Sequence, residues 1–136
     1  MRYRDLREWI GAARELGEVR DVKGASWQED IGRVTEMLHH TDDSPAVLFD
    51  DIPGYPRGFR ILANANATRR RLALTFGLPL DIERRPLMDE FLRLTDAARA
   101  IPPKVVKDGP VFENVLRGDD IDVLKFPSPL WHPLDG

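Results

Sequence analysis

The stretch 45–64, PAVLFDDIPGYPRGFRILAN, decides the fold of this 136-residue chain. It holds two short apolar runs, Ala46–Phe49 and Phe59–Leu62, separated by residues rich in proline and glycine. Runs of this length, bounded by Asp, Pro and Gly, are typical of strands buried on both faces. Between them, Pro53-Gly54 predicts a type II turn, because proline presets φ at the second turn position and glycine tolerates a positive φ at the third. The two predicted strands are either antiparallel neighbours or splay apart.

Amphipathic patterns on both sides of this stretch predict four helices, at residues 5–16, 26–40, 68–76 and 86–98. In each helix apolar residues recur with the spacing that places them on one face. We expect the following side chains to face the core: Leu6, Trp9, Ile10, Ala13, Leu16, Ile31, Val34, Leu38, Leu72, Ala73, Phe76, Leu87, Phe91, Leu94 and Ala98. The least costly arrangement packs these helices on the sheet.

Capping signals mark the starts of the first two helices. Asp5 with Glu8, and Ser26 with Glu29, have the three-residue spacing of a capping box, in which each side chain accepts a backbone N–H of the other residue. Gly32, inside the second helix, costs up to about 1 kcal/mol relative to alanine.

The predicted fold class is α/β (α+β), with a small central mixed sheet packed by about four helices. Glu18–Val22 also predicts a short strand, although its alternation is poor. The helical patterns end before Pro102-Pro103, and beyond these prolines the sequence predicts short extended segments. We therefore expect two parts: a helix-and-sheet N-terminal domain at residues 1–103, and an extended, proline-rich segment at 104–136.

Composition limits the classes of function. The net charge is −3, which gives no basic surface for nucleic acid or for an anionic membrane. No apolar run approaches the roughly 20 residues that span a bilayer, and the first nine residues lack the apolar core of a signal peptide. The chain has no cysteine, so disulfides, thiolate metal sites and cysteine nucleophiles are excluded. These features predict a soluble, cytoplasmic protein.

The sequence shows no nucleophile–base pair, no glycine-rich phosphate loop after a strand and no cluster with metal-ligand spacing. The adjacent histidines His39-His40 point about 100° apart on a helix and cannot readily share a metal. The acidic pairs Asp42-Asp43, Asp50-Asp51 and Asp119-Asp120 are typical of turns and helix caps. We therefore expect no catalytic, cofactor-binding or metal-binding residue in this chain.

Three consecutive arginines, Arg69, Arg70 and Arg71, follow Thr68, the predicted N-cap of the third helix. Cations are unfavourable at this end of a helix dipole, by about 0.3–1 kcal/mol each. One interpretation is a solvated face whose long stems cover apolar surface. The other is a docking point for carboxylates or phosphate on another domain or ligand. The first interpretation is favoured.

The segment Lys125–Gly136, KFPSPLWHPLDG, places Phe126, Leu130, Trp131 and Leu134 among three prolines. The prolines exclude a regular helix or a central strand, so the segment cannot bury its own apolar side chains. Either these side chains lie against a partner surface, or the segment folds back over the domain's own sheet. The sequence leaves the two interpretations balanced.

The order of motifs resembles the N-terminal region of UbiD-type decarboxylases over essentially the whole chain. The matching pieces are DLREWIGAARELGEVRDV, SWQEDIGRVTEML, PAVLFDDIPGYP, NANATRRRLALTFGL and VLRGDDIDVLKFPSPLWHPLDG. Each piece alone is weak, but five in the right order are fairly specific. The NANAT turn departs from many relatives, which have Gly or Ser before the arginines.

The resemblance implies a prenylated-FMN-dependent enzyme that adds or removes CO2 on aromatic or α,β-unsaturated acids. In that family the cofactor domain follows this region, and it holds prenylated FMN with Mn2+ and in some cases K+. The resemblance thus predicts that this chain is an N-terminal domain or fragment, which packs on the cofactor domain and is inactive alone. The expected partner is the rest of the decarboxylase polypeptide or a partner subunit, in a homo-oligomer.

Two alternatives stay open at this point. The chain is a complete small subunit of a multi-subunit carboxylase, or it is a non-enzymatic protein-interaction module with the same fold. The substrate and the direction of the reaction do not follow from this region of the family.

Overall fold

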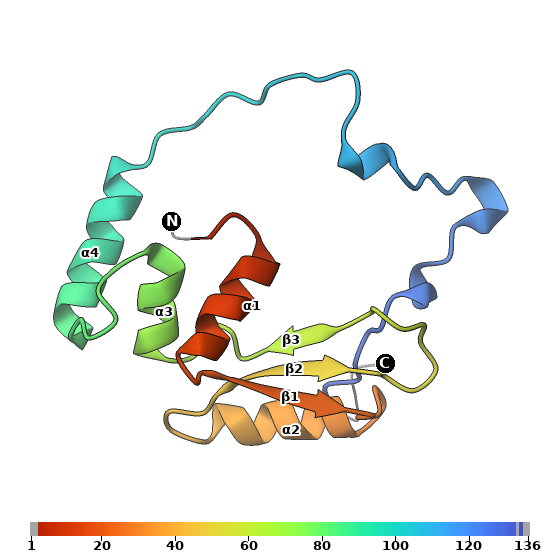
Figure 1. The fold of residues 1–136 in the computed structure, drawn as a ribbon, viewed down its shortest axis with the longest axis horizontal. Helices are drawn as coiled ribbons and strands as arrows, with labels where there is room; N and C mark the ends of the chain where they lie inside the picture. Colours follow the sequence, from red (N-terminus) through yellow and green to blue (C-terminus); the bar gives the residue numbers. More distant parts are fainter. Residues whose placement is uncertain (1–2, 133, 135–136) are drawn as a thin grey trace.

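The computed structural model describes residues 3–132 and 134. The elements follow one another along the chain as shown in Figure 1. They are α1 (Leu6–Glu15), β1 (Val19–Lys23), α2 (Asp30–His39), β2 (Ala46–Asp50), β3 (Ile61–Ala63), α3 (Arg69–Phe76) and α4 (Arg84–Ala97), then 3-10 turns at Pro110–Phe112, Gly118–Asp120 and Val123–Lys125. The predicted α/β class, with a small mixed sheet and four helices, is confirmed.

The sheet has the strand order β1-β2-β3. β1 and β2 are parallel, with Val19 opposite Ala46, so α2 forms the crossover between them. β2 and β3 are antiparallel, with Val47 opposite Ala63. The two strands of the central stretch are therefore antiparallel neighbours, and the weak strand predicted from residue 18 is real.

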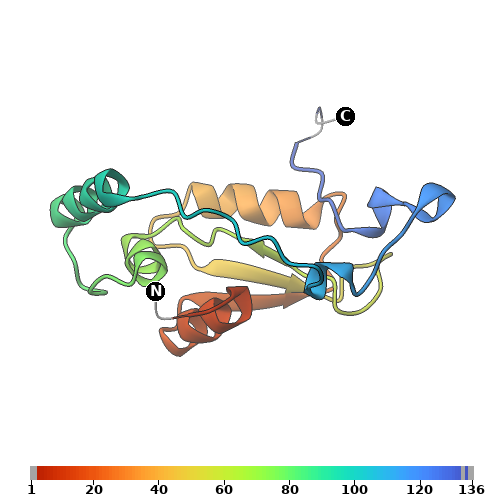
Figure 2. The same cartoon turned by 90° about the horizontal axis from the view of Figure 1, so that it is seen from above.

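The sheet is covered on both faces, which explains the unbroken apolar run of β2. Successive side chains of a strand point to opposite faces, so Ala46 and Leu48 join one core and Val47 and Phe49 join the other. The first core includes Trp9, Ile10 and Ala13 of α1 and Leu74 of α3, and the second includes Ile31 and Leu38 of α2. Figure 2 shows α1 and α2 on opposite sides of the sheet.

The connection between β2 and β3 contains the predicted turn. Gly54 has φ +88°, and the N–H of Tyr55 donates to the carbonyl of Ile52 at 3.2 Å, as a type II turn requires. β3 starts later than predicted, at Ile61. Phe59 instead closes a turn by donating its N–H to the carbonyl of Pro56, at 3.4 Å, and this turn takes it out of the ladder.

The caps differ in part from the prediction. Asp5 accepts the N–H of Glu8 at 2.9 Å, but the Glu8 carboxylate accepts the N–H of Arg4 and does not close the box on Asp5. The Ser26–Glu29 box is wrong, because α2 begins at Asp30 with Glu29, not Ser26, as its N-cap. Ser26 pairs reciprocally with Asp30, whose N–H donates to Ser26 Oγ at 3.2 Å while the Ser26 N–H donates to Asp30 at 2.8 Å.

The predicted inner faces of α1 and α4 are only partly correct. Leu6, the first residue of α1, is 58% exposed. On α4 only Leu87 is buried, while Phe91 and Leu94 stay 41% and 36% exposed. α4 packs against α3 through the edge-to-face contact of Phe76 with Phe91, at 5.3 Å between ring centroids, and does not reach the sheet cores.

After α4 the chain leaves the rest of the domain in a wide arc and then returns to α2 (Figures 1 and 2). We call residues 98–126 the arc. Residues 98–129 contain only short 3-10 turns. Asp122, rather than the Asp119-Asp120 pair, caps the last of these turns by accepting the N–H of Leu124 at 2.9 Å. Among the described residues, no helix has the length and apolar character needed to cross a membrane.

Candidate functional site

The arginine triplet lies in the first turn of α3, next to the edge of the sheet. Thr68 caps the helix as predicted, with its side chain accepting the N–H of Arg71 at 3.3 Å. The three arginines then point in different directions because successive helical residues are about 100° apart. Arg71 is fully buried, whereas the side chains of Arg69 and Arg70 are about half exposed, at 45% and 48%.

Arg71 uses its whole guanidinium group. It donates to the Glu18 carboxylate at 2.8 Å, and to the carbonyl oxygens of Ser44, Asn64 and Ala65 at 2.8, 3.0 and 3.1 Å. Glu18 precedes β1, Ser44 precedes β2 and Asn64 follows β3, so these partners all lie at one edge of the mixed sheet. A single buried cation therefore joins the ends of all three strands to α3.

For Arg71 this role corrects the favoured interpretation of a solvated face, whereas Arg69 and Arg70 remain about half exposed. Burial lowers the pKa of the Arg71 guanidinium, while its hydrogen bond to Glu18 and the charge of that carboxylate act in the opposite direction. Arginine still keeps its proton at neutral pH, so Arg71 is not an acid or base for chemistry. It is a structural clamp.

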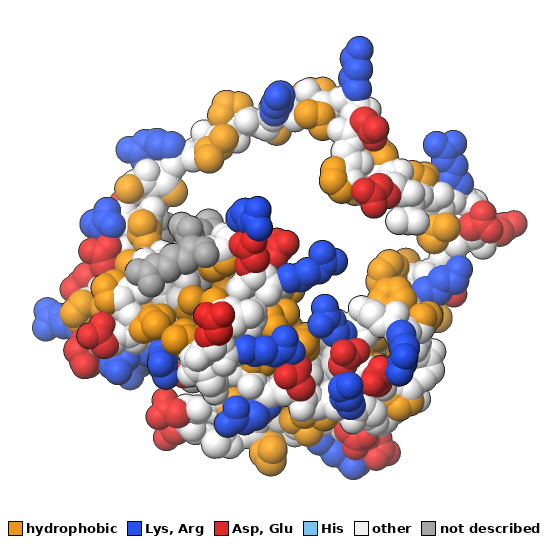
Figure 3. All heavy atoms as spheres, viewed as in Figure 1, with side chains coloured by type: hydrophobic (Ala, Val, Ile, Leu, Met, Phe, Trp, Pro, Cys, Tyr) orange, Lys and Arg blue, Asp and Glu red, His pale blue; other side chains and the backbone are white. Residues whose placement is uncertain are grey.

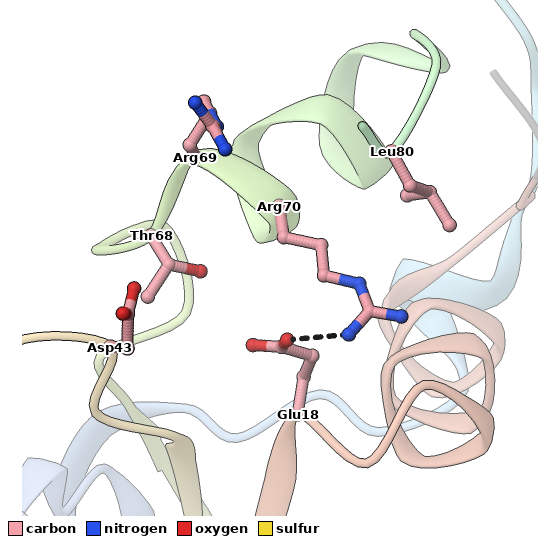
Figure 4. A pocket seen from close by; sticks show the side chains of 6 residues that line it. All are labelled: Glu18, Asp43, Thr68, Arg69, Arg70 and Leu80. Carbon is pink, nitrogen blue, oxygen red and sulfur yellow. Dashed lines mark hydrogen bonds and ion pairs between the residues drawn. The ribbon is translucent and has the colours of Figure 1, made fainter. Parts of the chain in front are cut away.

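The other two arginines border a hollow of about 280 Å³, lined by Glu18, Asp43, Thr68, Arg69, Arg70 and Leu80 (Figure 4). Arg70 reaches Glu18 at 3.3 Å, and Arg69 pairs with Glu83 at 2.9 Å. Each cation already has a carboxylate partner, and Asp43 adds a further negative charge to the lining. The lining of the hollow therefore carries both positive and negative charges, and it is not a basic pocket for an anion.

The remaining candidate residues form no reactive group. His39 and His40 are exposed at the end of α2, where His40 Nε2 lies 2.9 Å from Glu36 Oε1. Asp43 and Asp51 have φ of +52° and +50°, the left-handed conformation that turns require. Within residues 3–132 and 134, no three His, Cys, Asp or Glu side chains lie where they could share a metal ion.

In the connection from β1 to α2 a parallel strand leads through Gly24 into a helix, as it does in many phosphate sites. Here Asp30 occupies the first position of α2, and its carboxylate pairs with Ser26. A second anion would be repelled at this end. The start of α2 therefore does not offer a phosphate site of the strand–loop–helix type.

One sequence feature pointed to the clamp, but it did not identify the partners of Arg71. Arginines in a first helical turn oppose the helix dipole and so call for a compensating partner. Nothing in the spacing pairs Glu18 with Arg71, which lies 53 residues further along the chain. The carbonyl acceptors could not be identified from the sequence, because every residue has a backbone carbonyl group.

Comparison with known proteins assigns this arrangement to a family. Residues 10–94 match the family model of the 3-octaprenyl-4-hydroxybenzoate carboxy-lyase N-terminal domain. A pyrrole-2-carboxylic acid decarboxylase from Pseudomonas aeruginosa is 34% identical over 97% of this chain.

Solved structures show the same fold. The vanillic acid decarboxylase of Sedimentibacter hydroxybenzoicus in its open form superposes with a TM-score of 0.79, at 26% identity over 96% of this chain and 28% of that chain. Its closed form gives a TM-score of 0.76, at 28% identity over 92% and 26%.

The chain spans about 28% of the length of the Pseudomonas decarboxylase that it matches. The family match covers the second sheet core, the first core except Trp9, most of α4 and the Glu18–Arg71 clamp. The chain belongs to the UbiD family of carboxy-lyases and corresponds to the N-terminal domain of that family.

Proposed function

We propose that this chain is the N-terminal domain of a UbiD-like decarboxylase that acts on aromatic or α,β-unsaturated carboxylic acids. The relatives named above are decarboxylases of pyrrole-2-carboxylic acid and vanillic acid, which supports an aromatic acid as substrate. In this proposal the domain has a structural role: it packs on the domain that binds prenylated FMN, and the residues that hold the flavin and its metals lie outside this chain. The chain alone is inactive.

The observation that carries the proposal is the apolar surface of α4 and of the arc after it. Met88 and Leu92 of α4 are 53% and 56% exposed. Further large apolar side chains are exposed along the arc (Figure 3): Ile101, Val105, Val106, Val111, Phe112, Val115, Leu116, Ile121, Val123, Leu124 and Phe126. Soluble proteins rarely leave so much apolar surface in water unless another surface covers it.

A decarboxylase domain is the partner that best accounts for this surface. The relatives are more than three times as long as this chain, since it covers only 26–28% of their length. Their remaining sequence is large enough to cover both α4 and the arc. The partner is either another part of the same polypeptide or a separate subunit. In both cases it must cover the exposed apolar side chains of α4 and the arc.

The double variant Met88→Gln/Leu92→Gln tests this proposal in the assembled decarboxylase. Both side chains are exposed in the domain itself, so the free energy of unfolding of the isolated chain should change by no more than about 0.5 kcal/mol. In the assembled enzyme the loss of two buried apolar contacts should lower the rate of CO2 release and the retention of prenylated FMN by about tenfold or more.

The matched control is Glu90→Gln/Arg93→Gln, which removes an exposed ion pair from the same helix. It should leave assembly and turnover near the level of the parent enzyme, because exposed pairs contribute little. If the Met88/Leu92 variant assembles and turns over like the parent, α4 does not contact the rest of the enzyme and the proposal is wrong.

A further inference from the structure

The end of the arc returns to the domain at α2. We call residues 127–132 the strap. The N–H of Leu130 donates to the carbonyl of Trp27 at 2.9 Å, just before α2. Further along the strap, His132 Nε2 lies 3.7 Å from Glu36 Oε2 on α2. Leu130 and Trp131 are half-buried, so the strap lies on α2 rather than over the sheet.

Gly32 is the residue of α2 that the strap crosses. A Cβ atom placed on Gly32 would lie 2.4 Å from the carbonyl oxygen of Leu130, 2.9 Å from that of Trp131 and 3.3 Å from Trp131 Cα. The first two distances are shorter than real Cβ contacts, and all three atoms belong to the backbone, which cannot rotate away as a side chain would. Any residue other than glycine would therefore push the strap off the helix.

The helix itself does not need this glycine. Gly32 is not among the residues with positive φ, so its backbone is open to any L-residue. Alanine would be favoured there on helix propensity alone. The unfavourable residue within α2 is explained by the backbone that packs against it.

We propose that the missing side chain of Gly32 leaves the space in which the strap backbone packs on α2, and that this contact holds the strap in place. We call the contact between Gly32 and the strap the latch. The arc is then held at both ends: at its start by α4, which packs on α3, and at its end by the strap. The edge-to-face contact of Phe59 with Phe126, at 5.6 Å between centroids, lies next to this second anchor. The latch thereby fixes where the exposed apolar residues of the arc are presented. This inference concerns contacts within the chain and does not depend on the proposed function.

The variant Gly32→Ala tests the latch through the amide hydrogen exchange of Leu130, measured by NMR. In the parent this N–H is hydrogen-bonded to Trp27, so its exchange reports docking of the strap. In Gly32→Ala we expect it to exchange at least about tenfold faster, while amides of β2 stay protected. Gly11→Ala on α1 is the control, since no atom lies within 4 Å of a Cβ at that position and Leu130 should be unaffected.

A second pair of variants keeps the test decisive if Gly32→Ala folds poorly. Leu130→Pro removes the N–H that bonds Trp27 and detaches the strap without changing α2. Once the strap is detached, Gly32→Ala should raise the midpoint of thermal unfolding as Gly11→Ala does, and it should raise it less or lower it in the parent background. Unchanged Leu130 exchange in Gly32→Ala, or equal midpoint shifts in both backgrounds, would overturn the latch.

Discussion

Replacing Arg71 by methionine should lower the free energy of unfolding by about 3–5 kcal/mol. Methionine keeps an unbranched apolar stem of similar length but removes every donor. The Glu18 carboxylate, 16% exposed, then loses its buried partner, and the carbonyls of Ser44, Asn64 and Ala65 lose their donor as well. Each buried group left unsatisfied costs about 1–3 kcal/mol. Because whole domains are stable by only about 5–15 kcal/mol, this single change should bring the chain close to unfolding.

The neighbouring arginine supplies the control. Arg70 pairs with the same carboxylate at 3.3 Å but is 48% exposed. Arg70→Met should therefore change the free energy of unfolding by less than about 1 kcal/mol. Chemical denaturation followed by circular dichroism compares the two variants. Equal losses for Arg70→Met and Arg71→Met would show that charge near Glu18, rather than the buried clamp, is what stabilises the sheet edge.

Phe49→Ala should cost about 3–5 kcal/mol, which is the range for removing a buried aromatic side chain. Phe49 is 0% exposed and packs in the core between the sheet and α2, together with Ile31 and Leu38. Its removal leaves a cavity between β2 and α2, and because β1 and β3 hold β2 on both sides, the strand can move little to fill it.

Phe112→Ala is the corresponding exposed change, because Phe112 is 59% exposed on the arc. In the isolated chain it should alter the free energy of unfolding by no more than about 0.5 kcal/mol. Thermal and denaturant unfolding of both variants check the pair. A Phe112→Ala loss as large as that of Phe49→Ala would mean that the arc packs on the domain, contrary to the structure.

Features set by local chemistry could be predicted from the sequence. The apolar run of β2, the turn at Pro53-Gly54 and the cap at Thr68 each depend on a few adjacent residues, and the structure confirms them. The acidic partner of Ser26 was misassigned by one position, because Glu29 and Asp30 are both acidic, and the helix start at Asp30 rather than after Ser26 was not predicted.

Features set by long-range contacts could not be predicted. The burial of Arg71 depends on carbonyl groups from two loops and on Glu18, and no local pattern encodes their meeting. Gly32 likewise reads as a helix defect until the strap, about a hundred residues further along the chain, is seen against it. Both residues look unfavourable in the sequence, and both are explained by backbone that arrives from elsewhere.

For the C-terminal segment the structure shows a fold-back, but onto α2 and not over the sheet, and the alternative of a partner surface stays a prediction. Its residues 127–132 fold back on the domain, on α2 rather than on the sheet, and Trp131 is half-buried there. The arc before them keeps its apolar side chains in solvent. Of the predicted segment Lys125–Gly136, residues 133, 135 and 136 lie outside the described residues.

The central claim is that this domain is a scaffold that presents α4 and the arc to a decarboxylase partner. Hydrogen exchange of the chain alone and within the assembled enzyme, read by mass spectrometry, tests it most directly. The account predicts strong new protection in residues 84–126 of the assembled enzyme, with little change in β1 and β2, which are already protected in the isolated chain. Equal exchange of residues 84–126 in the two samples would contradict it.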